Sequence, residues 1–125
     1  MATEQSRIDA LLNKLLRKEL YVVITEPLHT SEIAEKLYEH LEGQIALERE
    51  GVMFGAGPLQ DEDKQRPTRG MWIIRAKSFA EARAIVDRDI LHKTGLRTYK
   101  LYRWSLNEGA LTLTVNFSDQ TAKIV

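Results

Sequence analysis

Two helical repeats of apolar residues stand out early in the chain. The first predicts a helix over 6–19, capped by Ser6, and the second predicts a helix that starts at Thr30 or Ser31 and ends near Gly51. In both segments the apolar residues recur at intervals of three or four, at Ile8, Leu11, Leu12, Leu15 and Leu16, and at Ile33, Leu37, Leu41 and Ile45. Each repeat therefore indicates a helix with one face suited to packing.

Later segments predict a third helix and several strands. Ser78 and Glu81 have the spacing of a capping box, which predicts a helix running to about Asp89. Runs rich in β-branched and aromatic residues predict strands over 20–25, 52–54, 70–75 and 98–106, and alternating residues predict a half-buried strand over 111–117. The Gly/Pro-rich segment 55–58 predicts a tight turn.

The order of these elements predicts an α+β fold. After the first helix it reads β-α-β-β-α-β, the ferredoxin-like pattern. We expect one domain over 1–125, made of an N-terminal helix (1–19), a ferredoxin-like core (20–106) and a C-terminal strand (107–125). Two helices would cover one face of the sheet and leave the other face open. A second copy of the chain could close that face, so a homodimer is expected.

Composition narrows the function classes. The chain has 125 residues, with 18 Lys and Arg against 18 Asp and Glu, and a balanced charge argues against a nucleic-acid partner. It has no cysteine, which excludes disulfides and thiolate chemistry. The N-terminus lacks the pattern of a signal peptide, and no apolar run approaches the ~20 residues that span a membrane. These features predict a soluble cytoplasmic protein with no membrane partner.

Two polar residues lie at apolar helical positions and are the strongest candidates for chemistry. His40 follows Leu37 by three residues, and Asp89 follows Ile85 and Val86 by four and three. An Asp at a helix C-terminus meets the unfavourable end of the dipole and would bind a proton more readily, which a nearby protonated His would offset. The two would then form a dyad for proton transfer near neutral pH. Alternatively, each residue simply satisfies the other or faces water.

Other candidate sites are weaker. Gly55 and Gly57 do not open a helix, so they do not form a phosphate loop, although their backbone could line a pocket beside His40. Arg75 and Arg97 could bind an anionic substrate or could be solvated strand ends. The three histidines, His29, His40 and His92, lack the close spacing of metal ligands. We therefore expect no metal and no cofactor.

Several segments resemble the YCII-related (YciI-like) family in order and spacing. They are His40-Leu41, Glu50 to Leu59, Gly70 to Ser78, Glu81-Ala82-Arg83, Asp89 and Gly95-Leu96. The resemblance implies a ferredoxin-like fold that pairs as a dimeric α/β barrel, with a His–Asp active site at His40 and Asp89. One type of relative dehydrochlorinates a hydroxylated aromatic. The family usually has Asp-Pro-Phe at the second site, whereas Ile90 follows Asp89 here, and this changes how the chain leaves the helix.

Together these features predict a small-molecule enzyme that uses acid–base chemistry, of the lyase, dehydrochlorinase or isomerase kind. His40 would move the proton and Asp89 would orient it, on a small and aromatic or carboxylated substrate. Substrate-binding groups are expected at Gly55, Gly57, Arg75 and Arg97. The alternative is a non-catalytic dimeric module that binds a small ligand or assists another protein.

Overall fold

A computed structural model describes residues 1–28 and 32–125. These residues fall into two compact units, one over 19–105 and one made of 1–18 and 106–125. The predicted start of the second helix, at Thr30 or Ser31, lies outside the described residues.

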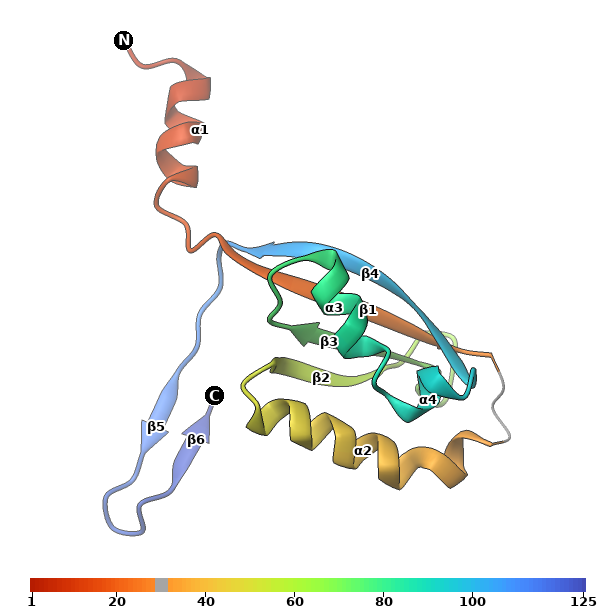
Figure 1. Ribbon diagram of the computed structural model, residues 1–125. Coiled ribbons are helices and arrows are strands. Elements are labelled where there is room, and N and C mark those ends of the chain that lie inside the picture. The colour runs from red at the N-terminus through yellow and green to blue at the C-terminus, as the bar shows by residue number, and fades with distance from the viewer. Residues whose placement is uncertain (29–31) are drawn as a thin grey trace. The chain divides into compact units, whose positions relative to one another are not determined.

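The larger unit is built on a four-stranded sheet in the order β2-β3-β1-β4 (Figure 1). Both β1 and β2 pair antiparallel with β3. The four strands are β1 (Lys18–Pro27), β2 (Met53–Leu59), β3 (Arg69–Ile74) and β4 (Arg97–Leu106). The helices are α2 (Ile33–Arg49), α3 (Phe79–Val86) and α4 (Ile90–Lys93). This is the predicted ferredoxin-like order, with the short α4 added between α3 and β4.

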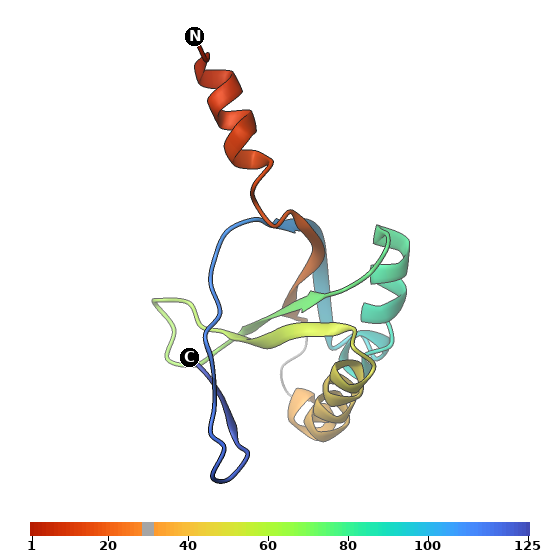
Figure 2. The ribbon, with the colours of Figure 1, turned by 90° about the vertical axis from the view of Figure 1, so that its left-hand side faces the viewer.

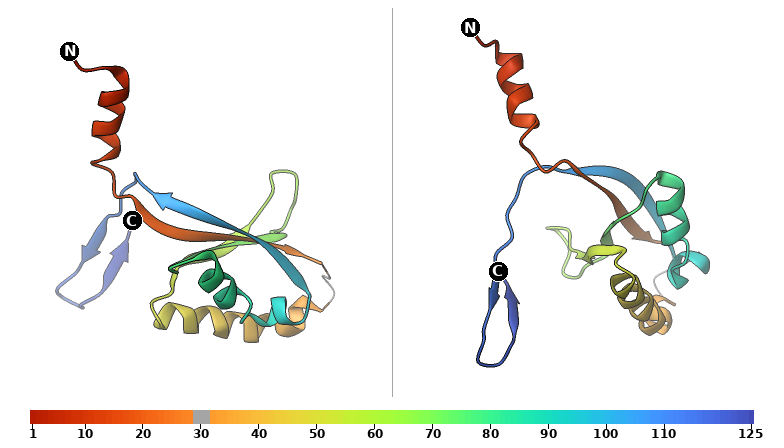
Figure 3. Two further views of the ribbon diagram at one scale, coloured as in Figure 1. Left: turned by 45° about the horizontal axis from the view of Figure 1, so that its top comes forward. Right: turned by 60° about the vertical axis from the view of Figure 1, so that its left-hand side comes forward.

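All three helices lie on one face of the sheet, as two further directions of view make clear (Figures 2 and 3). Because side chains alternate along a strand, every second residue of β1 and β3 points toward the helices. Those residues form the core with one side of the helices, and the cluster comprises Tyr21, Val23, Leu47, Trp72, Ile74, Ala82, Ile85 and Val86. The alternate residues of these strands face the side of the sheet away from the helices and are only partly buried. They include Val22, Ile24, Met71 and Ile73.

The helix ends follow local sequence signals. Ser78 Oγ accepts the backbone N–H of Glu81 at 3.1 Å, so Ser78 caps α3 as predicted, while Oε2 of Glu81 accepts from the backbone of Lys77 at 3.0 Å and not from that of Ser78. Gly51 follows α2 with a φ of +77°, a conformation that glycine adopts without strain. The predicted end of α2 near Gly51 is therefore confirmed, whereas α3 ends at Val86, earlier than the predicted Asp89.

The prediction for the buried face of α2 is wrong. Leu37, Leu41 and Ile45 are 44%, 49% and 47% exposed, and Leu47 is the buried residue of this helix. The face turned to the sheet instead carries residues of mixed chemistry, at His40, Gly43, Gln44 and Leu47. Small and polar residues on this face leave space between helix and sheet, and that space becomes the site.

The predicted turn at 55–58 is also wrong, because β2 runs through it. Gly55 and Gly57 do not have a positive φ, and a bulge lies between Met53 and Gly55 in the pairing with β3. Pro58 is tolerated because β2 is the edge strand of the sheet.

The smaller unit differs from expectation in extent and burial. Helix α1 covers Glu4–Leu12, with Thr3 rather than Ser6 as its cap, and none of its residues is buried. The C-terminal segment forms a two-stranded hairpin, β5 (Leu113–Val115) with β6 (Ala122–Ile124), instead of one strand. Both strands are exposed along their length, so the predicted half-buried strand is wrong. No described helix is long and apolar enough to cross a membrane.

Candidate active site

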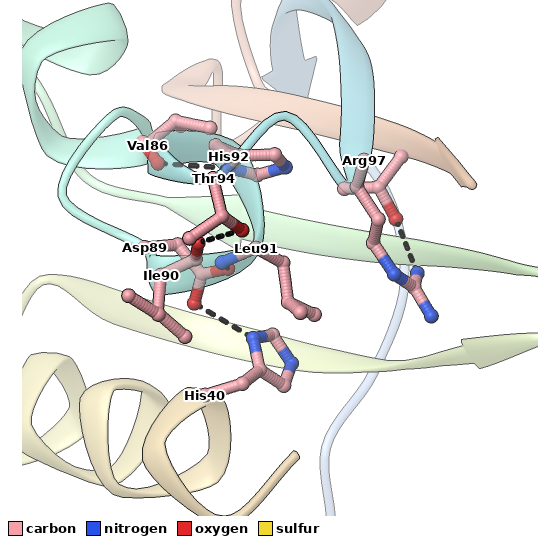
Figure 4. Close-up of polar contacts among 9 residues, drawn as sticks. His40, Val86, Asp89, Ile90, Leu91, His92, Thr94 and Arg97 are labelled. Atoms are coloured by element: carbon pink, nitrogen blue, oxygen red, sulfur yellow. Dashed lines mark hydrogen bonds and ion pairs between the residues drawn. The ribbon is translucent and has the colours of Figure 1, made fainter. Parts of the chain in front are cut away.

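His40 and Asp89 are in direct contact, as the predicted dyad requires. Nδ1 of His40, on α2, lies 2.7 Å from Oδ1 of Asp89 (Figure 4). Their side chains are only 17% and 4% exposed. Because an ionised carboxylate can only accept, the hydrogen of this bond is on Nδ1, and in the neutral imidazole Nε2 of His40 then keeps its lone pair. The contact is confirmed, and the catalytic role of the pair stays a prediction.

Asp89 lies at the start of a helix and not at the end of one. It is the N-cap of α4, and its Oδ2 accepts the backbone N–H of Leu91 at 3.0 Å. The expectation based on the C-terminal end of a helix dipole is therefore wrong, since helix N-termini favour negative charge. Both carboxylate oxygens are engaged, one by α2 and one by α4, and this fixes the orientation of the His40 ring.

The missing proline after Asp89 has a simple explanation. Ile90 is the first residue of α4, directly after the N-cap. The first helical position needs no backbone donor, so both proline and other residues fit there. The change to Ile90 is therefore compatible with the His40–Asp89 contact.

A cavity of about 350 Å³ lies beside His40, between α2, α4 and the sheet. Its wall is mostly apolar but includes several polar side chains. The lining residues are Thr25, Leu37, His40, Leu41, Gln44, Ala56, Gly57, Pro58, Arg69, Gly70, Trp72, His92 and Arg97. A space of this size is in the range of small-molecule sites. A methyl group at Gly70 would lie 2.9 Å from Oγ1 of Thr25, so glycine keeps this part of the wall open.

Two of the four predicted binding residues reach the cavity. Gly57 and Arg97 line it, whereas Gly55 and Arg75 do not. Arg75 has the parity of Ile73, which faces away from the helices, and its Nη1 donates to the backbone oxygens of Gly51 and Met53 at 3.2 and 3.4 Å.

Three residues of the cavity wall have a buried polar atom without a hydrogen-bond partner among the described residues. These atoms are Oε1 of Gln44, Nε2 of His92 and Nε of Arg97. Buried polar atoms are nearly always paired, so a concentration of exceptions in one cavity marks a place for a polar molecule. Gln44, Thr25, Arg69 and Trp72 were not predicted as site residues. A helical spacing of four from His40 was the one signal for Gln44.

The second histidine of the site is held neutral by its surroundings. Nδ1 of His92 donates to the backbone oxygen of Val86 at 2.9 Å, and the ring lies 5.5 Å from Trp72 and 4.9 Å from Tyr99 between centroids. Burial lowers the pKa of His92, an effect that the Val86 carbonyl and the charges of Asp89 and Asp87 partly oppose.

This lowered pKa predicts a pH effect on stability. In the unfolded chain His92 takes up a proton as the pH falls below about 6.5, while in the folded protein it stays neutral to lower pH. Protonation of His92 in the unfolded chain therefore has no effect on stability above this pH. It destabilises the fold as the pH falls toward the pKa of His92 in the folded protein. As the pH is lowered from 7.5 to 5.5, the Tm of the wild type should therefore fall relative to the Tm of His92→Phe. Parallel Tm curves for the two proteins would contradict this.

The described part of the site contains no evident metal centre. In the parts of the chain that the structure describes, no three His, Cys, Asp or Glu side chains lie close enough together to hold a metal ion. Of the histidines considered from the sequence, His40 and His92 both line the cavity, and His29 lies outside the described residues.

Comparisons with known proteins agree with the fold. No curated protein matches the chain significantly. A solved structure, 5-chloro-2-hydroxyhydroquinone dehydrochlorinase from Burkholderia phenoliruptrix in complex with 2,5-dihydroxybenzoquinone, is similar at 20% sequence identity with a TM-score of 0.55. The match covers 68% of this chain and 92% of that one. The YCII-related domain matches residues 20–105, most of the larger unit that carries the cavity. The chain therefore belongs to the YCII-related family.

Proposed function

We propose that the chain is a small-molecule enzyme in which His40 acts as a general base and Asp89 orients it. The observation that carries the proposal is the buried contact of 2.7 Å between Nδ1 of His40 and Oδ1 of Asp89, on a residue that lines the cavity. This arrangement leaves Nε2 of His40 as the basic atom. Among the described residues no protein group hydrogen-bonds to that atom.

The chemistry follows from this arrangement. Nε2 of His40 accepts a proton from a C–H or O–H bond of the substrate, and the electron pair of that bond passes into the substrate's π system. Asp89 stabilises the imidazolium that results, because its carboxylate stays 2.7 Å from Nδ1. If a leaving group such as chloride departs from the adjacent carbon, the reaction is an elimination. If the proton returns at another atom, it is an isomerisation.

The similar dehydrochlorinase gives a starting point for the substrate search. That enzyme is named for a chlorinated hydroxyhydroquinone and was solved with a dihydroxybenzoquinone. A set of chlorinated and unchlorinated hydroxybenzenes and hydroxybenzoates should be incubated with the protein in D2O. Chloride release and deuterium at ring carbons, followed by NMR, are the expected signals. A protein that binds these compounds but catalyses neither reaction would contradict the proposed function.

We also propose that the open face of the sheet is the contact surface of a homodimer. Partly buried apolar residues of the two central strands face this side, at Val22, Ile24, Met71 and Ile73, and Tyr102 on β4 is 49% exposed. Light scattering is expected to give about twice the chain mass of 14.3 kDa at micromolar concentration. Ile73→Glu should yield monomers, because it places a charge in the contact. Ile45→Glu, on α2, is the control and should remain dimeric. A wild-type monomer would contradict the proposal.

A further inference from the structure

Two arginines line the cavity, and they differ in their charge partners. Nη2 of Arg69 lies 2.8 Å from Oδ1 of Asp61, and its Nη1 lies 4.0 Å from Oε1 of Glu26. Arg97 has no carboxylate within ion-pair distance among the described residues, and its Nη1 donates to the neutral hydroxyl of Thr25 at 3.0 Å. A partly buried cation without a counterion is unfavourable unless a ligand supplies the negative charge. Arg97 is therefore the group in the wall that is free to bind an anion.

Burial also makes the positive charge of Arg97 less favourable. It lowers the pKa of the guanidinium, while the negative charge of Asp89 opposes this effect. The side chain is thus partly withdrawn from water, and an anion that reaches it binds in an environment of low dielectric. Its unpartnered Nε is one more donor available to such an anion.

His92 provides a hydrogen-bond acceptor in the same cavity wall. Since Nδ1 donates to Val86 and burial keeps the ring neutral, Nε2 of His92 can only accept a hydrogen bond. In Figure 4 the second ring nitrogens of His40 and His92 point to the same side, toward Arg97. The cavity thus combines an anion site at Arg97, an acceptor at His92 and a base at His40.

The rest of the wall favours a flat apolar body. Trp72 and the His92 ring lie side by side, and Leu37, Ala56 and Pro58 add apolar surface without charge. We propose that the cavity selects a small hydroxylated ring compound with one anionic group. The anionic group binds Arg97, and a ring hydroxyl donates to Nε2 of His92. This inference rests on the proposed function, because it names the substrate class of the same site.

Binding measurements separate the two contacts. The probes are the three hydroxybenzoate isomers, benzoate and the three hydroxybenzamides, titrated into the 125-residue chain by calorimetry. One hydroxybenzoate isomer should bind on the order of tenfold or more tightly than both benzoate and its own amide, because each of these lacks one contact. Equal binding of the charged and neutral compounds, or no binding of any compound at millimolar concentration, would overturn the inference.

Two variants assign each preference to its residue. Arg97→Gln should abolish the preference for the acid over the amide and keep that for the hydroxyl. His92→Asn can retain the donor to Val86 but removes Nε2. It should therefore abolish the preference for the hydroxyl and keep that for the acid over the amide. These are ratios of affinities within one protein, so partial unfolding of a variant does not affect them. Arg49→Gln, which removes an equal charge from an exposed position on α2, should keep both preferences. Unchanged preferences in Arg97→Gln and His92→Asn would refute the assignment.

The outcome is independent of catalysis. If the selective binding is found and no hydroxybenzoate reacts, the ligand class stands and the proposed acid–base function fails. If turnover is found on a neutral compound that binds as well as its anionic counterpart, the function stands and the ligand class fails.

Discussion

Replacing His40 by asparagine should slow turnover by about 10²- to 10⁴-fold, the usual contribution of a general base. The expected loss is this large because Nε2 is the basic atom and asparagine has no equivalent of it. The asparagine amide can still donate to Oδ1 of Asp89, in the position of Nδ1, so the protein should remain folded. The measurement is kcat on whichever compound of the D2O screen reacts, together with Tm.

A control variant makes this result specific. Glu39→Gln removes a titratable group from the neighbouring, exposed position of α2 and should leave kcat within about twofold, as for most substitutions away from a site. A His40→Asn variant that retains most of the wild-type activity would exclude His40 as the base.

Replacing Asp89 by alanine should lower the free energy of unfolding by about 2–4 kcal/mol. The substitution removes the cap of α4, which is worth about 0.5–2 kcal/mol, and a charge-assisted hydrogen bond to His40, worth about 1.5–3 kcal/mol. The two terms share one carboxylate and are not expected to add fully. Urea unfolding followed by circular dichroism measures the change.

Asp89→Asn separates the structural role of this residue from its chemical role. The asparagine oxygen can still accept from the backbone of Leu91, so this variant should recover much of the stability that alanine loses. It cannot stabilise an imidazolium at His40, so turnover should still fall. Asp87→Ala, the control, loses an exposed hydrogen bond from Tyr99 and should cost about 0.5–1.5 kcal/mol. If Asp89→Asn unfolds as readily as Asp89→Ala and the wild type binds none of the probes, the non-catalytic alternative is favoured.

The sequence predicted the parts of the fold that depend on local signals. The Ser78–Glu81 capping box, the glycine after α2 and the β-rich runs identified most elements of the larger unit and their order. Helical spacing also singled out His40 and Asp89 as polar residues beside apolar neighbours, although it placed Asp89 in a helix that ends at Val86. Family resemblance then related the two positions.

What the sequence did not reveal depends on packing over distance. The repeat of Leu37, Leu41 and Ile45 indicated a buried face. The side of α2 that faces the sheet is instead the neighbouring one, which carries His40 and Gln44. Asp89 was assigned to the end of a helix because nothing local marked the break after Val86. His92, on α4, shares a wall with the predicted Arg97 at the start of β4, and no spacing along the chain predicted that His92 would lie there.

The double engagement of Asp89 has a consequence for how this site can diverge. One carboxylate joins two helices, so a substitution that removes both acceptor oxygens changes fold stability and the position of His40 together. Ala56 and Pro58, in contrast, contribute to the cavity from the edge strand β2. If the proposed function holds, related proteins can acquire different substrates by changing the size of this wall, while selection for a folded protein favours keeping the carboxylate of Asp89.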